Sequence, residues 1–139
     1  MFRATHIVLM IFLSAFVQAQ ETGIPCRHLN VEEFYLKLHS YSNAILIDTR
    51  TFDEFKKDRI PGAILAESRE KLLKLTDSLD FDQPLFLYCE FDERSYVGCD
   101  ILSKLGFRYV YNLKGGLREW RLSPYELDKK KIREKRPFF

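Results

Sequence analysis

The stretch Leu85-Phe86-Leu87-Tyr88-Cys89 decides the fold, and it is followed directly by Glu-Phe-Asp-Glu-Arg-Ser at residues 90–95. Four apolar or aromatic residues without a polar break predict a strand that is covered on both faces. Cys89 closes this strand, Arg94 follows five positions later, and an apolar-periodic segment typical of a helix continues to Leu105 before Gly106. Because ligands of open α/β sheets bind at the carboxyl ends of strands, the stretch predicts a nucleophilic thiol where a loop and a helix start meet.

Strands and helices alternate along the rest of the chain. Side chains that cap helices mark two helix starts, Asn30 with Glu33 and Thr51 with Glu54. The alternation predicts an α/β fold, a small parallel β-sheet flanked by helices on both faces. The other expected strands lie at residues 27–29, 44–48, up to 65 and 109–113. The expected helices lie at 30–38, from 51 until residues 60–63 end it, at 68–79, at 94–105 and around Trp120.

The first 19 residues are predicted to be a signal peptide that is not part of the fold. Arg3 supplies the positive start, residues 7–17 the apolar run, and Val17-Gln18-Ala19 the cleavage pattern. A bilayer span needs roughly 20 apolar residues, so no stable membrane span is expected after cleavage near Ala19; an uncleaved anchor is the alternative. We expect an exported protein, periplasmic or secreted.

The remainder is expected to hold a single domain over residues 20–122 and a basic tail over residues 123–139. A chain of 139 residues suffices for one domain with a core. The tail is interpreted as a solvated, frayed terminus, with attachment to an anionic surface or partner as the alternative. The formal net charge is only +2, which gives no argument for nucleic-acid binding.

Three cysteines form an odd set, so at least one is free or pairs outside the chain. An oxidising compartment would permit a Cys26–Cys99 disulfide, but nothing in the sequence brings these residues together, and none is expected. Cys99 lies on the predicted helix after the loop and is interpreted as a packing residue, with a resolving thiol as the alternative. Cys26 has no local signal either way, and an odd number of cysteines suits a reactive Cys89.

Three groups of residues resemble the signatures of the rhodanese-like family in its single-domain form, and the resemblance covers about residues 30–120. Each group is weak alone, but three in the right order and spacing are specific. The groups are Asp48-Thr49-Arg50 with Glu54-Phe55 and Ile60-Pro61-Gly62-Ala63; Tyr88-Cys89 with Arg94-Ser95; and Gly106-Phe107, Val110-Tyr111-Asn112-Leu113 and Gly115-Gly116 before Trp120.

The resemblance implies a sulfurtransferase in which Cys89 accepts a sulfane sulfur, becomes a persulfide and passes the sulfur to a thiophilic acceptor. The expected partners are a small sulfur-containing donor and a thiol or cyanide-type acceptor, with a protein thiol among the candidates. No metal and no organic cofactor is required. Asp48 and Arg50 would brace the loop, and the substrate would be bound by Glu90, Phe91, Asp92, Glu93, Arg94 and Ser95.

Elementary chemistry supports this assignment independently. A thiolate is the nucleophile, and a helix N-terminus with cationic neighbours stabilises it. Successive loop amides form a concavity that binds anions, and the planar fork of Arg94 can hold a pair of oxygen atoms. The mechanism requires an open ring of amides and a sulfur atom that solvent can reach.

One departure from the family pattern concerns charge. Asp92 stands where the family often has glycine, and Glu90 and Glu93 flank it. Three carboxylates near the thiol oppose a dianionic donor such as thiosulfate. If these side chains point outward, the loop amides can still bind an anion, and the carboxylates select the partner.

Three alternatives remain open. Cell-cycle dual-specificity phosphatases share the fold, but their loop has five residues between cysteine and arginine, whereas this loop has four. A non-catalytic module could bind a partner or sense redox state through Cys89. Cys89 could also be a buried apolar residue, although an arginine in a polar loop argues against this.

Overall fold

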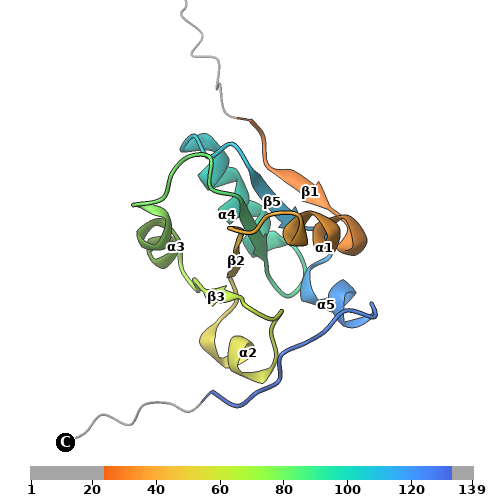
Figure 1. Ribbon diagram of the computed structural model, residues 1–139. Helices are drawn as coiled ribbons and strands as arrows, with labels where there is room; N and C mark the ends of the chain where they lie inside the picture. Colours follow the sequence, from red (N-terminus) through yellow and green to blue (C-terminus); the bar gives the residue numbers. More distant parts are fainter. Residues whose placement is uncertain (1–23, 133–139) are drawn as a thin grey trace, which may run out of the picture.

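Five parallel strands form one sheet in the order β1-β5-β4-β2-β3 (Figure 1). The computed structural model describes residues 24–132. All four residues of the central strand β4 are buried, as the apolar run predicts. The strands are β1 (Arg27–Leu29), β2 (Ile45–Asp48), β3 (Ile64–Leu65), β4 (Leu85–Tyr88) and β5 (Val110–Leu113).

Helices cover both faces of this sheet, so the predicted fold class is confirmed. On one face the core includes Phe34 and Trp120, and on the other it includes Leu72 and Leu102. The first pair lies on α1 and α5 and the second on α3 and α4, which makes three layers. The helices are α1 (Val31–His39), α2 (Phe52–Lys57), α3 (Arg69–Thr76), α4 (Glu93–Lys104) and α5 (Gly116–Arg121).

Both predicted capping boxes are present. Asn30 Oδ1 accepts a hydrogen bond from Glu33 N at 3.0 Å, and Thr51 Oγ1 accepts one from Glu54 N at 3.3 Å. Helix α3 ends at Thr76, three residues before the predicted end. The Thr76 hydroxyl donates to the Leu72 carbonyl at 3.0 Å, a local bond of the kind that competes with helical structure.

Cys26 and Cys99 form a disulfide, so the expectation that they do not pair is wrong. Cys26 directly precedes β1, and β1 pairs with β5 at the edge of the sheet, with Arg27 opposite Tyr111. Helix α4 contacts β5, and this brings Cys99 over the same edge. The bond joins positions 73 residues apart, and the sheet order that brings them together is a tertiary property without a local sequence signal.

Loss of this bond is expected to destabilise the domain. The replacement Cys26→Ser should lower the free energy of unfolding by about 2–4 kcal/mol, because the unfolded chain regains the freedom that a long closed loop removes. Urea denaturation followed by circular dichroism measures this. Wild-type protein unfolded in dithiothreitol should match the variant; a variant as stable as the oxidised wild type would show that the bond contributes nothing.

The segment after α5 packs on the domain, so its interpretation as a frayed terminus is wrong for the part that the structure describes. Trp120 Nε1 donates to the Glu126 carbonyl at 3.0 Å, and Arg59 pairs with Asp128 at 2.8 Å. Figure 1 shows this segment passing α2. Residues 1–19, the predicted signal peptide, lie outside the described residues, as do residues 133–139 of the tail. Between residues 24 and 132, no helix has the length and apolar character that a bilayer crossing needs.

Candidate active site

The carboxyl ends of three neighbouring strands bring the candidate residues together. Cys89 follows β4, Thr49 and Arg50 follow β2, and Asn112 lies near the end of β5. Helix α4 starts at Glu93, so residues 89–92 form a short loop between the central strand and a helix N-terminus. This is the edge at which open α/β sheets bind ligands.

The Cys89 side chain lies at the base of this loop and is only 1% exposed. The requirement that solvent reaches the sulfur atom is therefore not met in this structure. The surroundings are nevertheless polar, because the Ser95 hydroxyl lies 3.4 Å from Sγ as a hydrogen-bond donor, and Cys89 contributes, after Glu54, to raising the pKa of the Arg94 guanidinium. A hydroxyl donor and a guanidinium are not the environment of an apolar filler residue.

The loop turns its carbonyl groups toward α5. Leu117 N donates to the Cys89 carbonyl at 2.8 Å, and Arg118 N donates to the Glu90 carbonyl at 3.0 Å. This close approach requires glycine at position 116 for two reasons. Its φ is +66°, which side chains disfavour, and a Cβ atom there would lie 2.6 Å from the carbonyl oxygens of Cys89, Glu90 and Phe91.

The loop amides consequently point the other way. In a trans peptide the N–H and C=O groups face opposite directions, so the amides that follow these carbonyls face away from α5. Within the described part of the chain, the backbone N–H groups of residues 90–95 have no hydrogen-bond acceptor. A row of unpaired amides at the start of a helix is suited to bind an anion.

Asp92 leaves these amides unoccupied. It is the N-cap residue of α4, yet its side chain makes no capping hydrogen bond. Its Oδ1 instead accepts a hydrogen bond from Asn112 Nδ2 at 2.6 Å. The Asp92 carboxylate is therefore directed toward β5 and away from the loop amides.

Glu90 is also held away from the amides, in an ionic cluster around Arg50. Arg50, which is 1% exposed, bonds to Asp48 at 2.8 Å and to Glu90 at 3.2 Å. Arg121 on α5 pairs with Glu90 and with Asp58, and this hydrogen bond to Arg121 is the main cause that lowers the pKa of Glu90 below its ordinary value. The cluster ties the loop to the end of β2 and to α5.

Arg94 faces α2. Its two terminal nitrogens bond to both carboxylate oxygens of Glu54 at 2.8 and 2.9 Å. This hydrogen bonding lowers the pKa of Glu54 to about 2 and raises that of Arg94. Glu54 is therefore ionised at neutral pH. Arg94, which is predicted to hold an anionic substrate, is paired with the carboxylate of Glu54 in this structure.

Sequence reasoning missed several members of this site. Glu54 was assigned only its capping role, although it bonds to Thr51 and to Arg94 at once. Asn112 bonds to Asp92, which lies 20 positions before it. Arg121 bonds to Glu90 and to Asp58, which lie 31 and 63 positions before it. Pairs so far apart in the sequence have no local signal. Within residues 24–132, no group of three or more His, Cys, Asp or Glu side chains is placed to hold a metal ion.

Comparison with known proteins finds one matching family model and several related sequences. A model of the protein family described as "Rhodanese-like domain" matches residues 30–123. The uncharacterized protein YqhL of Bacillus subtilis is 36% identical over 92 residues, which are 66% of this chain and 70% of YqhL. A protein named "Sulfurtransferase" from Allochromatium vinosum is 27% identical over 92 residues, 66% of this chain and 85% of its own length.

Solved structures show the same fold. A thiosulfate sulfurtransferase from Pseudomonas aeruginosa matches with a TM-score of 0.66 and 27% identity, over 76% of this chain and 21% of that protein. The chain also spans only 55% of the length of the B. subtilis relative YrkF, to which it is 27% identical over 102 residues. The similarity therefore concerns one domain of some larger proteins.

Proposed function

Because the chain belongs to the rhodanese-like domain family, we propose that it is an exported sulfurtransferase that carries sulfane sulfur as a persulfide on Cys89. One observation carries the proposal. The Cys89 sulfur lies beside a loop whose amides, from Glu90 to Ser95, have no acceptor among the described residues. This arrangement would stabilise the negative charge of a thiolate or of a persulfide.

The chemistry is nucleophilic catalysis in two steps. The Cys89 thiolate attacks the outer sulfur of the donor, the S–S bond of the donor breaks, and the remainder leaves with the electron pair. An acceptor thiolate then attacks the outer sulfur of the persulfide and releases Cys89 as a thiolate. The buried sulfur requires an opening movement, which we assign to Arg94, because this residue lies in the first turn of α4 at the end of the loop and its side chain is 43% exposed.

The ion pair of Arg94 with Glu54 bears on the choice of donor. A dianion such as thiosulfate would have to compete with the Glu54 carboxylate for the same guanidinium fork. A persulfide donor carries less charge and needs this fork less. We therefore place persulfides ahead of thiosulfate as donors.

The replacement Glu54→Gln is expected to improve the use of thiosulfate. Glutamine can still close the capping box with Thr51, but it no longer holds Arg94 by charge. Since an exposed ion pair contributes up to about 1 kcal/mol, the KM for thiosulfate should fall by up to about fivefold. Steady-state kinetics measures this, with Glu32→Gln on α1 as a control of equal charge change. An unchanged KM would show that Glu54 does not compete with the donor.

Export is supported by the disulfide together with the predicted signal peptide. Disulfides persist in oxidising compartments and are rare in the cytosol. The Cys26–Cys99 bond therefore fits a periplasmic or secreted protein. Fractionation of cells that produce the full chain, with N-terminal sequencing of the mature product, tests this; a product that retains Met1 and stays in the cytosol would contradict it.

Turnover distinguishes the enzyme from a non-catalytic module. Initial rates with a persulfide donor and a thiol acceptor, each varied at several concentrations of the other, should give the parallel double-reciprocal lines of a ping-pong mechanism. The absence of turnover with all donors and acceptors, from a correctly folded protein, would favour the binding or redox-sensing module.

A further inference from the structure

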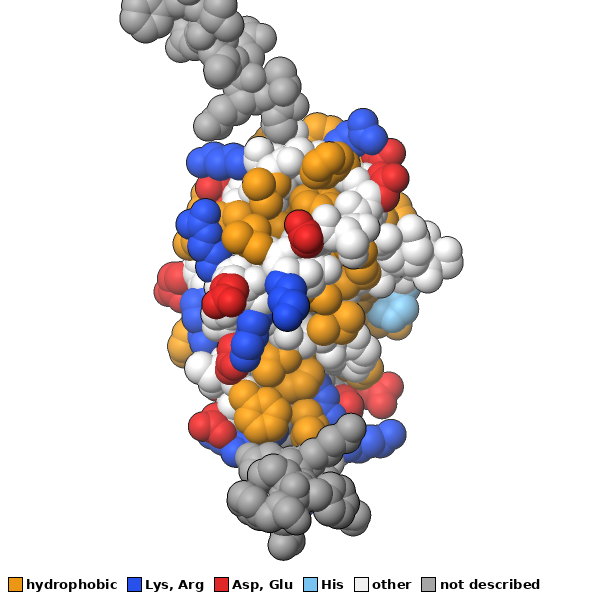
Figure 2. Space-filling view, turned by 90° about the vertical axis from the view of Figure 1, so that its left-hand side faces the viewer, with side chains coloured by type: hydrophobic (Ala, Val, Ile, Leu, Met, Phe, Trp, Pro, Cys, Tyr) orange, Lys and Arg blue, Asp and Glu red, His pale blue; other side chains and the backbone are white. Residues whose placement is uncertain are grey.

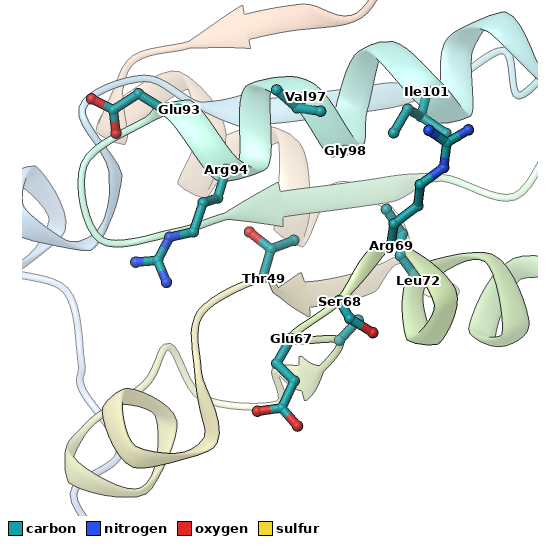
Figure 3. A pocket seen from close by; sticks show the side chains of 11 residues that line it. Thr49, Glu67, Ser68, Arg69, Leu72, Glu93, Arg94, Val97, Gly98 and Ile101 are labelled. Atoms are coloured by element: carbon teal, nitrogen blue, oxygen red, sulfur yellow. The ribbon is translucent and has the colours of Figure 1, made fainter.

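A cleft of about 370 Å³ opens beside the active-site loop, between α4 and the start of α3 (Figure 3). Arg94, in the first turn of α4, and Thr49, whose hydroxyl donates to the Tyr88 carbonyl at 3.2 Å, both line this cleft, so the cleft adjoins the loop that begins at Cys89, although Cys89 itself does not line it. The proposed function assigns roles to Cys89 and the loop amides, but none to this cleft.

The cleft has an apolar body. Leu72 lines it from α3, and Val97 and Ile101 line it from successive turns of α4. Gly98 permits α4 to pack closely here, because a Cβ atom would lie 3.1 Å from the Leu72 side chain. Val97 is 57% exposed, which leaves apolar surface available for a ligand.

A cation lies at each end of the cleft. Arg94 is near the loop, and Arg69, at the start of α3, turns its guanidinium toward Ile101 (Figure 3). Ile101 lies seven positions after Arg94 on α4, a distance of about 10 Å along the helix. Among the described residues, Arg69 has neither an ion-pair nor a hydrogen-bond partner, whereas Arg94 is paired with Glu54.

The acidic side chains at the cleft do not neutralise Arg69. Glu67 is bonded to Lys71 and to Phe52 N. Glu93 also lines the cleft, but its carboxylate points toward the loop, away from Arg69 (Figure 3). The surrounding face carries hydrophobic side chains interspersed with charges of both signs (Figure 2). Selectivity for a charged ligand would therefore come from the side chains that line the cleft and not from the net charge of this face.

We propose that this cleft binds the sulfur acceptor, a small aliphatic thiol with a terminal carboxylate. Its carbon chain would lie on Leu72, Val97 and Ile101, its carboxylate would pair with Arg69, and its thiol would reach Cys89 past Arg94. The assignment rests on the proposed function. The acceptor thiolate attacks the outer sulfur of the persulfide, the S–S bond to Cys89 breaks, and the acceptor leaves as a persulfide, so no external oxidant or reductant is needed.

Binding is tested first with probes that lack a thiol and therefore cannot exchange with the disulfide. Octanoate and octanol are titrated into the wild-type protein, and methyl NMR shifts of Val97 and Ile101 report the dissociation constants. We expect octanoate to bind about fivefold more tightly than octanol, the upper range for an exposed ion pair. In Arg69→Gln the two probes should bind equally, whereas Arg108→Gln, the same change outside the cleft, should keep the preference.

Equal binding of the two probes to wild-type protein, or shifts confined to other parts of the domain, would overturn the proposal. The second test compares 8-mercaptooctanoate with 8-mercaptooctanol as acceptors. A kcat/KM that is about fivefold higher for the carboxylate supports the assignment, and equal values refute it. If octanoate binds through Arg69 but Cys89 takes up no sulfur, the proposed function fails, whereas the cleft is still shown to bind aliphatic carboxylates.

Discussion

The replacement Cys89→Ser is expected to abolish sulfur transfer while the fold stays intact. Without the thiol no persulfide can form, and the route through a covalent intermediate is lost. Serine differs by one atom and keeps a group that can bond to the Ser95 hydroxyl, which lies 3.4 Å from Sγ. Activity should fall below detection in an assay with a persulfide donor and a thiol acceptor, and the circular dichroism spectrum should be unchanged.

Cys26→Ser provides the matched control for this experiment. Cys26 lies at the edge of the sheet in the disulfide with Cys99, away from the loop. Under conditions in which this variant is folded, it should retain sulfur transfer. Transfer by Cys89→Ser at the wild-type rate would assign the chemistry to another group.

The largest effect on stability is expected for Arg50→Met. The Asp48 carboxylate is 0% exposed and bonds to Arg50 at 2.8 Å, so the variant leaves a buried charge without its partner. Breaking a buried ion pair in this way costs about 3–5 kcal/mol. The effect should also reach the active site, because Arg50 holds Glu90 in the loop. Urea denaturation and sulfur-transfer kinetics measure the two consequences.

Arg121→Met is the control for Arg50→Met. It removes a guanidinium that bonds to the same acids, Asp58 and Glu90, but from a site that is 33% exposed. Since solvent can replace the lost partner there, the free energy of unfolding should fall by only about 0–1 kcal/mol, the range for surface ion pairs. Equal losses in the two variants would mean that burial of the Asp48–Arg50 pair does not set the cost.

Local signals predicted the elements of the fold well. The apolar run before Cys89 predicts β4, and the pairs Asn30/Glu33 and Thr51/Glu54 predict the starts of α1 and α2, because capping acts within one turn of helix. The alternation of strands and helices predicts a parallel sheet. The position of Cys89 at the carboxyl end of the central strand follows from the same pattern.

The features that sequence reasoning missed are long-range. The disulfide depends on β1 lying beside β5, which the alternation of elements does not specify. The pairing of Arg94 with Glu54 joins residues 40 positions apart. The packing of the segment after Ser123 depends on Arg59, which lies 69 positions before its partner Asp128. The burial of Cys89 is also a long-range feature, because α5, which starts 27 positions after it, packs on the loop and Leu117 N donates to the Cys89 carbonyl at 2.8 Å.

The intact mass of the protein after incubation with sulfane-sulfur donors tests the central claim most directly. We predict a gain of one sulfur atom, its removal by a thiol acceptor, and no gain in Cys89→Ser. A folded wild-type protein that gains no sulfur from any persulfide donor or from thiosulfate would contradict the account.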